Sequence, residues 1–265
     1  MIKQFTLILL FFFMLTSCSE YQKAVKSKDN DTKFKVASQY YEKGKYSKAI
    51  LLFESMGGAY RSHPDGEKMY YMFGDSYYKK KQYLLAAYQY ETFVASFPKS
   101  EKLEECAFLA AKCYTFLSAK YSLDQKQTIK AIDKLQNFIN DYPKSAQLAE
   151  ANRVMKELTT KLEKKSFEIA KQYNTTSNHK AAIKSLDIFM SENPGTIFKE
   201  ESLFLKLDSG YKLAINSIEE KKLERLQNAK NYYNSLIKFN KDTKYKEQAD
   251  KMLAEIETEI KQFNK

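Results

Sequence analysis

Glycine and proline are scarce in this chain, which has only 7 of the first and 4 of the second among its 265 residues. All-β and turn-rich folds use both freely, and in helix interiors both are unfavourable. Their scarcity argues against those folds. Leucine, lysine, glutamate, alanine and tyrosine are instead plentiful. The sequence therefore predicts an all-α fold.

Histidine and cysteine are also rare. His63 lies beside Pro64 in a predicted turn, and neither it nor His179 has a second ligand at metal-binding spacing. A Gly-rich phosphate loop and a nucleophile elbow are absent as well. We therefore expect no enzyme, no cofactor and no metal. Cys106 and Cys113 are seven residues apart, about 10 Å along a helix, which exceeds the reach of a disulfide and indicates core residues.

Arginine is represented only by Arg61, Arg153 and Arg225, so the net charge of +11 comes almost wholly from lysine. Nucleic-acid-binding proteins usually concentrate arginine and lysine in a stripe beside a recognisable motif. Neither feature occurs here, and we expect no nucleic-acid partner. Dispersed lysines are typical of solvated helix faces. A weak attraction to anionic lipid or acidic partners is compatible with them, but the sequence does not localise it.

An apolar run occupies residues 5–15, after the basic Lys3. Eleven residues of helix rise about 16 Å, roughly half the hydrocarbon thickness of a bilayer, so residues 1–17 are predicted to be a cleaved export signal. The run ends in Leu-Thr-Ser before Cys18, which resembles the lipobox of bacterial lipoproteins. An ordinary signal followed by a chance cysteine is the alternative. We expect Cys18 to be acylated, with polar residues 18–32 as a flexible tether.

Helical repeats follow the tether. One set of residues has the spacing of a tetratricopeptide unit: Tyr70, Phe73, Gly74, Tyr77, Ala86, Tyr90, Phe93 and Pro98. Its small residue, aromatic and alanine recur as Ala37, Tyr40, Ala49 and as Ala170, Tyr173, Ala182. Small residues at fixed positions allow two helix axes to approach closely, while aromatic side chains fill the space beside them. The pattern predicts a tetratricopeptide-repeat solenoid.

The ends of the repeats follow a rule too. Pro98, Pro143 and Pro194 each lie twelve residues after a repeat alanine, and Ser100, Ser145 or Thr196 follows two residues later as a predicted N-cap. The repeat domain is predicted at 33–265, with five helix pairs and a capping helix at about 33–57, 65–96, 100–141, 145–192, 197–240 and 244–263.

Repeats of this kind present a concave surface lined by the first helix of each pair. In this register the candidate peptide-binding residues of the first two units are Phe34, Ser38, Tyr41, Tyr71, Asp75 and Tyr78. Aromatic faces flanked by polar groups suit an extended or hairpin peptide that ends in an aromatic residue. The alternative is that several of these tyrosines pack between neighbouring helices.

Several stretches resemble the BamD family of outer-membrane protein assembly lipoproteins. They are residues 77–83 leading to Ala86, 93–98, 124–132, 138–143 and 170–173 with 181–183. The resemblance covers nearly the whole mature chain, together with the lipobox and the number of helix pairs. The irregular first unit, with its Gly57-Gly58 pair, and the sparse arginines depart from the family.

The resemblance implies a lipid-anchored protein on the periplasmic face of the outer membrane. It implies that the N-terminal repeats receive unfolded outer-membrane proteins, whereas the C-terminal repeats, about 145–240, bind a BamA-like insertase. Ser19 after the cysteine favours the outer membrane, since by family analogy an aspartate there favours the inner membrane. A tetratricopeptide lipoprotein that serves as scaffold for another envelope complex, such as a cell-wall complex, is the alternative function.

Overall fold

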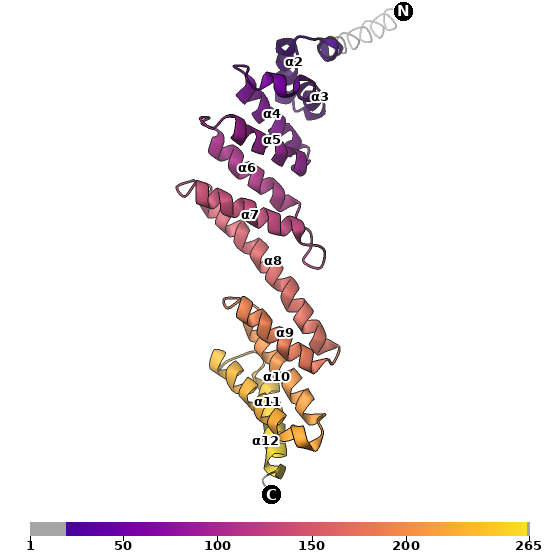
Figure 1. Cartoon of the computed structure of the whole chain (residues 1–265), viewed down its shortest axis with the longest axis vertical. Helices are drawn as coiled ribbons and strands as arrows, with labels where there is room; N and C mark the ends of the chain where they lie inside the picture. The colour runs from indigo at the N-terminus through magenta and orange to yellow at the C-terminus, as the bar shows by residue number, and fades with distance from the viewer. Residues whose placement is uncertain (1–19, 264–265) are drawn as a thin grey trace, which may run out of the picture. The chain divides into compact units, whose positions relative to one another are not determined.

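The computed structural model describes residues 20–263, and within that range all the regular secondary structure is helical (Figure 1). The predicted all-α class is confirmed. Cys18 and the export signal lie outside the described residues. The chain divides into two compact units: unit 1 extends to Leu158 without residues 121–123, and unit 2 comprises those three residues and the chain from Thr159 onward.

Unit 1 is built from helix pairs. The helices are α2 (Asn30–Glu42), α3 (Tyr46–Met56), α4 (Gly66–Lys79), α5 (Tyr83–Ser96), α6 (Leu103–Phe116) and α7 (Lys126–Asp141), with the 3₁₀ helix η1 (Gly57–Tyr60) after α3. Each helix packs against the next one along the chain, both within a pair and between pairs. Their apolar faces merge into one continuous core, as expected for stacked helical repeats.

Unit 2 contains α9 (His179–Glu192), α10 (Lys199–Ile215), α11 (Glu219–Phe239) and α12 (Lys246–Phe263). Helix α12 packs against α10 and α11, the position of a cap. The 28-residue helix α8 (Leu148–Thr175) contributes residues to both units. Its residues Ala151 and Leu158 belong to the core of unit 1, whereas Phe167 and Ala170 pack with α9. Within residues 20–263, no helix combines the length and apolarity that crossing a bilayer requires.

Small side chains bring paired helices close together, as the repeat pattern predicts. A Cβ atom added to Gly74 would lie 3.0 Å from the ring of Tyr90, which is itself fully buried. In unit 2 a Cβ atom added to Gly210 would lie 2.7 Å from the ring of Tyr232. The repeat alanines, including Ala86, are buried as well. Backbone and ring are therefore in direct contact where the sequence has its small residues.

The predicted N-caps Ser100 and Thr196 are wrong, because the N-caps of α6 and α10 are Lys102 and Phe198. Helix α6 begins at Leu103 and its N-cap is Lys102, so Ser100 lies in the turn before the helix. There the Ser100 hydroxyl accepts a hydrogen bond from the Lys102 amide at 3.0 Å and donates one to Glu67 in α4 at 2.7 Å. Ser145 makes the equivalent pair of bonds before α8. The repeated hydroxyl therefore stabilises the turn before the helix and bonds that turn to the preceding helix pair.

Residues 20–26 form a helix that packs against the first repeat, whereas the sequence predicts a flexible tether over 18–32. Tyr21 and Ala24 are both buried. The Tyr21 ring meets Tyr40 of α2 edge-on at 5.2 Å between centroids, and Lys48 of α3 lies over both rings. Two apolar side chains three residues apart share one helix face, which gives this segment a surface to bury.

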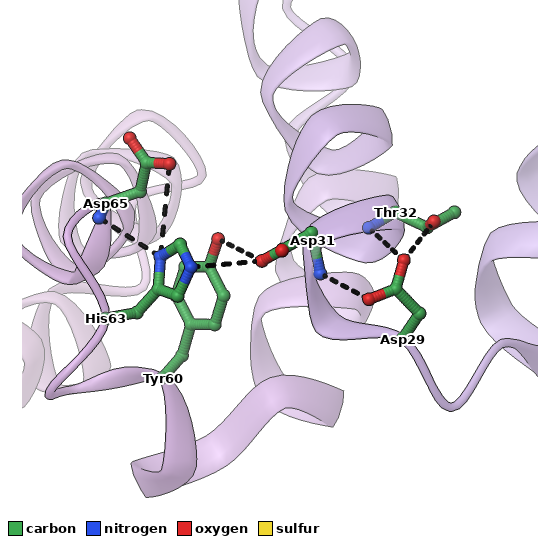
Figure 2. A network of polar contacts seen from close by, with 6 residues as sticks. All are labelled: Asp29, Asp31, Thr32, Tyr60, His63 and Asp65. Atoms are coloured by element: carbon green, nitrogen blue, oxygen red, sulfur yellow. Dashed lines mark hydrogen bonds and ion pairs between the residues drawn. The ribbon is translucent and has the colours of Figure 1, made fainter.

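The irregular end of the first repeat is attached to α2 by the contacts in Figure 2. Tyr60 is buried, and its hydroxyl donates to Asp31 at 3.2 Å. The ring of His63 stacks on Tyr60 at 4.2 Å between centroids. Asp29 accepts hydrogen bonds from the amides of Asp31 and Thr32, and so caps α2. Residues 57–65 therefore pack against the first turn of α2.

Candidate peptide-binding surface

The six predicted peptide-binding residues lie on the first helices of two consecutive pairs. Helix α2 carries Phe34, Ser38 and Tyr41, and α4 carries Tyr71, Asp75 and Tyr78. Spacings of three and four residues place each set on one side of its helix. The contacts of the individual side chains differ considerably, and they decide which of them remain available to a ligand.

Phe34 and Ser38 contact other helices of the domain. Phe34 is buried, with its ring 5.4 Å from that of Tyr60. The Ser38 hydroxyl lies 3.8 Å from the sulfur of Met72 in α4. Phe34 is thus part of the core, and Ser38 lies at the contact between α2 and α4.

Tyr41 and Asp75 form a hydrogen bond between neighbouring repeats. The Tyr41 hydroxyl donates to Asp75 Oδ2 at 2.8 Å, and only 9% of the surface of Asp75 is exposed. Burial, together with this bond to a carboxylate, raises the pKa of the Tyr41 phenol. The phenol therefore stays protonated and serves as donor to the carboxylate.

Tyr71 repeats this arrangement one pair further along the chain. Its hydroxyl donates to Glu105 Oε1 at 2.8 Å, and Lys102 lies 4.4 Å above its ring. Lys102 also pairs with Glu105 at 3.0 Å. Burial acts to raise the pKa of Glu105, but the hydrogen bonds from Lys102 and Tyr71 outweigh it and hold that pKa below its ordinary value.

Both hydrogen bonds join residues 34 positions apart, which is the length of a tetratricopeptide repeat. The same spacing appears in unit 2, where the Asn174 side chain donates to Asp208 at 2.7 Å. The hydroxyls of Tyr41 and Tyr71, two of the predicted peptide-binding residues, therefore bond to the next repeat. That these residues bind a peptide stays a prediction. A search for donors and carboxylates 34 residues apart would have found all three bonds in the sequence.

Tyr78 differs from the other two tyrosines of the set. Its ring lies 5.7 Å from Tyr83 and 6.0 Å from Phe116, and the last two stack at 4.3 Å. Phe116 is 47% exposed, and Tyr78 and Tyr83 are half-buried. Burial raises the pKa of the Tyr78 phenol, while Lys112 opposes the shift. We call these three residues the aromatic cluster; its Tyr83 and Phe116 were missed by the repeat register.

The two histidines have structural surroundings. His63 Nδ1 accepts a hydrogen bond from the Asp65 amide at 3.1 Å, and Nε2 lies 3.2 Å from Asp31 (Figure 2). The ring is therefore the tautomer that carries its proton on Nε2. His179 begins α9, and burial with the nearby Lys212 lowers its pKa despite Asp208. Among the described residues, no cluster of three potential metal ligands occurs.

A comparison against protein families assigns the chain to one of them. A family model named YfiO and described as an outer membrane lipoprotein matches residues 26–226. The chain belongs to the YfiO family. This YfiO-family chain is 23% identical over 230 residues to the outer membrane protein assembly factor BamD of Pasteurella multocida, a match that covers 83% of this chain and 88% of the relative. Membership in the family supports association with the outer membrane.

More distant similarities were also found. The Caulobacter vibrioides assembly factor BamD is 22% identical over 178 residues, covering 66% of this YfiO-family chain and 57% of the relative. Among solved structures, a TPR2AB domain of yeast Sti1 is 14% identical, with a TM-score of 0.37 over 86% of this chain and 98% of that one. A Podosopora anserina putative kinesin light chain is 16% identical, with a TM-score of 0.32 over 77% and 94%.

Proposed function

We propose that this chain is the lipoprotein subunit of a β-barrel assembly machinery and binds unfolded outer-membrane proteins on its N-terminal repeats. Cys18 carries the acyl anchor, and the repeat domain faces the periplasm. The C-terminal repeats, about 145–240, bind a BamA-like insertase. Two assembly factors among the relatives and the family match support this role.

The observation that carries the substrate site is the aromatic cluster. The hydroxyls of Tyr41 and Tyr71 are engaged by carboxylates of the next repeat, and Phe34 is in the core. Tyr78, by contrast, forms part of a partly exposed group of three rings that ends in Phe116. Such rings accept an aromatic or large apolar side chain of an extended segment by edge-on or offset packing. The exposed part of Phe116 offers apolar area to such a side chain.

The substrate site is tested by measuring the affinity of a labelled peptide that corresponds to the C-terminal segment of an outer-membrane protein. Tyr78→Ala/Phe116→Ala is expected to weaken binding at least tenfold, because an aromatic anchor contributes about 2 kcal/mol or more at an interface. Tyr78→Phe keeps the ring and should bind like the wild type. Tyr88→Ala is the matched control, since Tyr88 is 62% exposed on α5 and outside the cluster.

Circular dichroism checks that the variants fold. A folded Tyr78→Ala/Phe116→Ala variant with unchanged peptide affinity would exclude the aromatic cluster as the substrate site. A loss of affinity as large in Tyr88→Ala would show that the effect is not specific to the cluster.

The insertase interface is supported by apolar side chains that unit 2 leaves exposed, among them Ile197 and Ile218. Charged residues are depleted in the core of a protein interface, and apolar residues are common there. Ile197→Lys/Ile218→Lys is therefore expected to reduce recovery of the insertase with the tagged lipoprotein from detergent-solubilised membranes. Ile129→Lys, an exposed isoleucine of unit 1, is the control. Equal recovery with all variants would refute this interface.

The lipid anchor is tested separately by the intact mass of the mature protein. Acyl groups on a chain that begins at Cys18 are expected. Cleavage elsewhere, or an unmodified cysteine, would contradict the anchor while leaving the repeat surface open to the peptide assay.

A further inference from the structure

A group of lysines surrounds the helix formed by residues 20–26. Lys23 and Lys26 are exposed on this helix, and Lys45 and Lys48 are exposed at the start of α3. Lys48 Nζ lies 5.0 Å from the ring of Tyr21, which joins the two sets. We call these four residues the lysine surface.

The helix is held in one orientation on the first repeat. Tyr21 and Ala24 are its buried residues, with Tyr21 packed against Tyr40. At 100° per residue, positions 23 and 26 lie on the side opposite these two. On the same count Val25, which is 44% exposed, lies about 40° from Tyr21 and about 100° from Lys26 around the helix. Lys23 and Lys26 therefore point away from the protein, and Val25 lies at the border of the buried face.

This part of the chain carries a net positive charge. Residues 20–48 contain eight lysines and four carboxylates, a net charge of +4 over 29 residues. Asp29 is engaged by the first amides of α2, and Asp31 by Tyr60 and His63. Within the described part of the chain, no lysine of the lysine surface forms an ion pair. Lys45 and Lys48 lie over the rings of Tyr40 and Tyr21, whereas the charges of Lys23 and Lys26 are available to a partner.

The position of Cys18 limits what that partner is. Only Ser19 and Glu20 separate it from Tyr21, and three steps of 3.8 Å allow at most about 11 Å between the Cα atoms of residues 18 and 21. An acylated Cys18 lies at the headgroup level of a bilayer. The helix that bears Lys23 and Lys26 is then within roughly a helix diameter of the headgroups, which is comparable with the Debye length of about 8 Å at physiological salt.

We propose that the lysine surface binds anionic phospholipid headgroups and so fixes the first repeat on the bilayer. The proposal rests on the acylation of Cys18 proposed above. A single anchor point leaves a domain free to rotate, whereas a helix packed on the repeat and bound to the surface gives it one orientation. The partner is a lipid surface because the covalent connection brings it within reach and the charges are complementary.

The experiment uses tryptophan fluorescence, since the chain has no tryptophan. Gln22→Trp places the reporter at an exposed position about 40° from Lys26 around the helix. The variant is made in the acylated mature protein, which is reconstituted into vesicles of brominated phosphatidylcholine with or without 30% phosphatidylglycerol. Quenching by bromine is expected to be stronger in the anionic vesicles and to fall in Lys23→Gln/Lys26→Gln. Lys238→Gln/Lys241→Gln removes the same charge from other exposed positions, and should leave the quenching unchanged. Tyr88→Trp is the reporter control on α5.

A second measurement removes the anchor. The mature chain with Cys18→Ser should partition into vesicles containing phosphatidylglycerol, and Lys23→Gln/Lys26→Gln should weaken that partitioning about 25-fold, roughly fivefold for each lysine near the surface. Quenching that is the same with and without anionic lipid, or the same in both lysine variants, would overturn the proposal. A mature protein without acyl groups would instead contradict the anchor, and the Cys18→Ser measurement would still decide whether the lysine surface binds anionic lipid.

Discussion

Replacing Tyr41 by phenylalanine removes one hydroxyl and keeps the ring. In the protein that hydroxyl is the hydrogen-bond donor to Asp75, a carboxylate with only 9% of its surface exposed. Among the described residues, Asp75 has no other hydrogen-bond donor. Tyr41→Phe therefore leaves a largely buried carboxylate unpaired at the contact between the first two repeats.

The expected cost follows from the chemistry of the pair. A hydrogen bond to a charged group contributes about 1.5–3 kcal/mol, and the loss is largest when the charge stays buried. Because some water reaches Asp75, we expect Tyr41→Phe to cost about 2 kcal/mol, which is roughly a 30-fold increase in the population in which the first two repeats are open. Asp75→Asn in the same background removes the charge and should recover about 1 kcal/mol of that loss.

Native-state hydrogen exchange of the α2 and α4 amides is the suitable assay, because it reports opening of these repeats without requiring the two units to unfold together. Tyr40→Phe is the matched control: this neighbouring tyrosine packs through its ring against Tyr21, and its hydroxyl forms no hydrogen bond to any residue that the structure describes. Exchange rates of Tyr41→Phe that match those of Tyr40→Phe would refute the role assigned to the 34-residue spacing.

Two further predictions concern the core of unit 1. Gly74→Ala should lower the free energy of unfolding, measured by calorimetry, by about 1–3 kcal/mol, because the added Cβ atom would press on the Tyr90 ring. Gly58→Ala is the control and should not lower it, because its added Cβ atom has no other atom within 4 Å. Burial raises the pKa of Cys106 and of Cys113 to about 12. The unfolded thiols ionise near pH 9, so their contribution to stability is complete below that pH and falls as the pH rises from 9 to 12. Urea titrations at pH 8 and pH 10 should show that the free energy of unfolding decreases. An equal free energy of unfolding at the two pH values, in the protein with both thiols, would contradict their burial.

The amino-acid sequence by itself determined the helices and their pairing. Scarce glycine and proline, and small residues such as Gly74 and Ala86 at fixed distances from aromatic ones, predict paired helices in close contact, and the structure has them. These features are local or recur with a fixed period, so a single repeat contains most of the information. The family resemblance could be recognised from the same residues.

Tertiary structure alone decided which partner each of those side chains has. Tyr41, Tyr71 and Tyr78 look alike in the repeat register, yet two of them donate to carboxylates of the next repeat and the third joins the aromatic cluster. Likewise, the periodicity of α8 does not reveal that its two halves belong to different cores. Periodicity specifies which face of a helix is apolar, but the partner of each polar atom depends on how neighbouring repeats stack, and that is a property of the assembled three-dimensional packing.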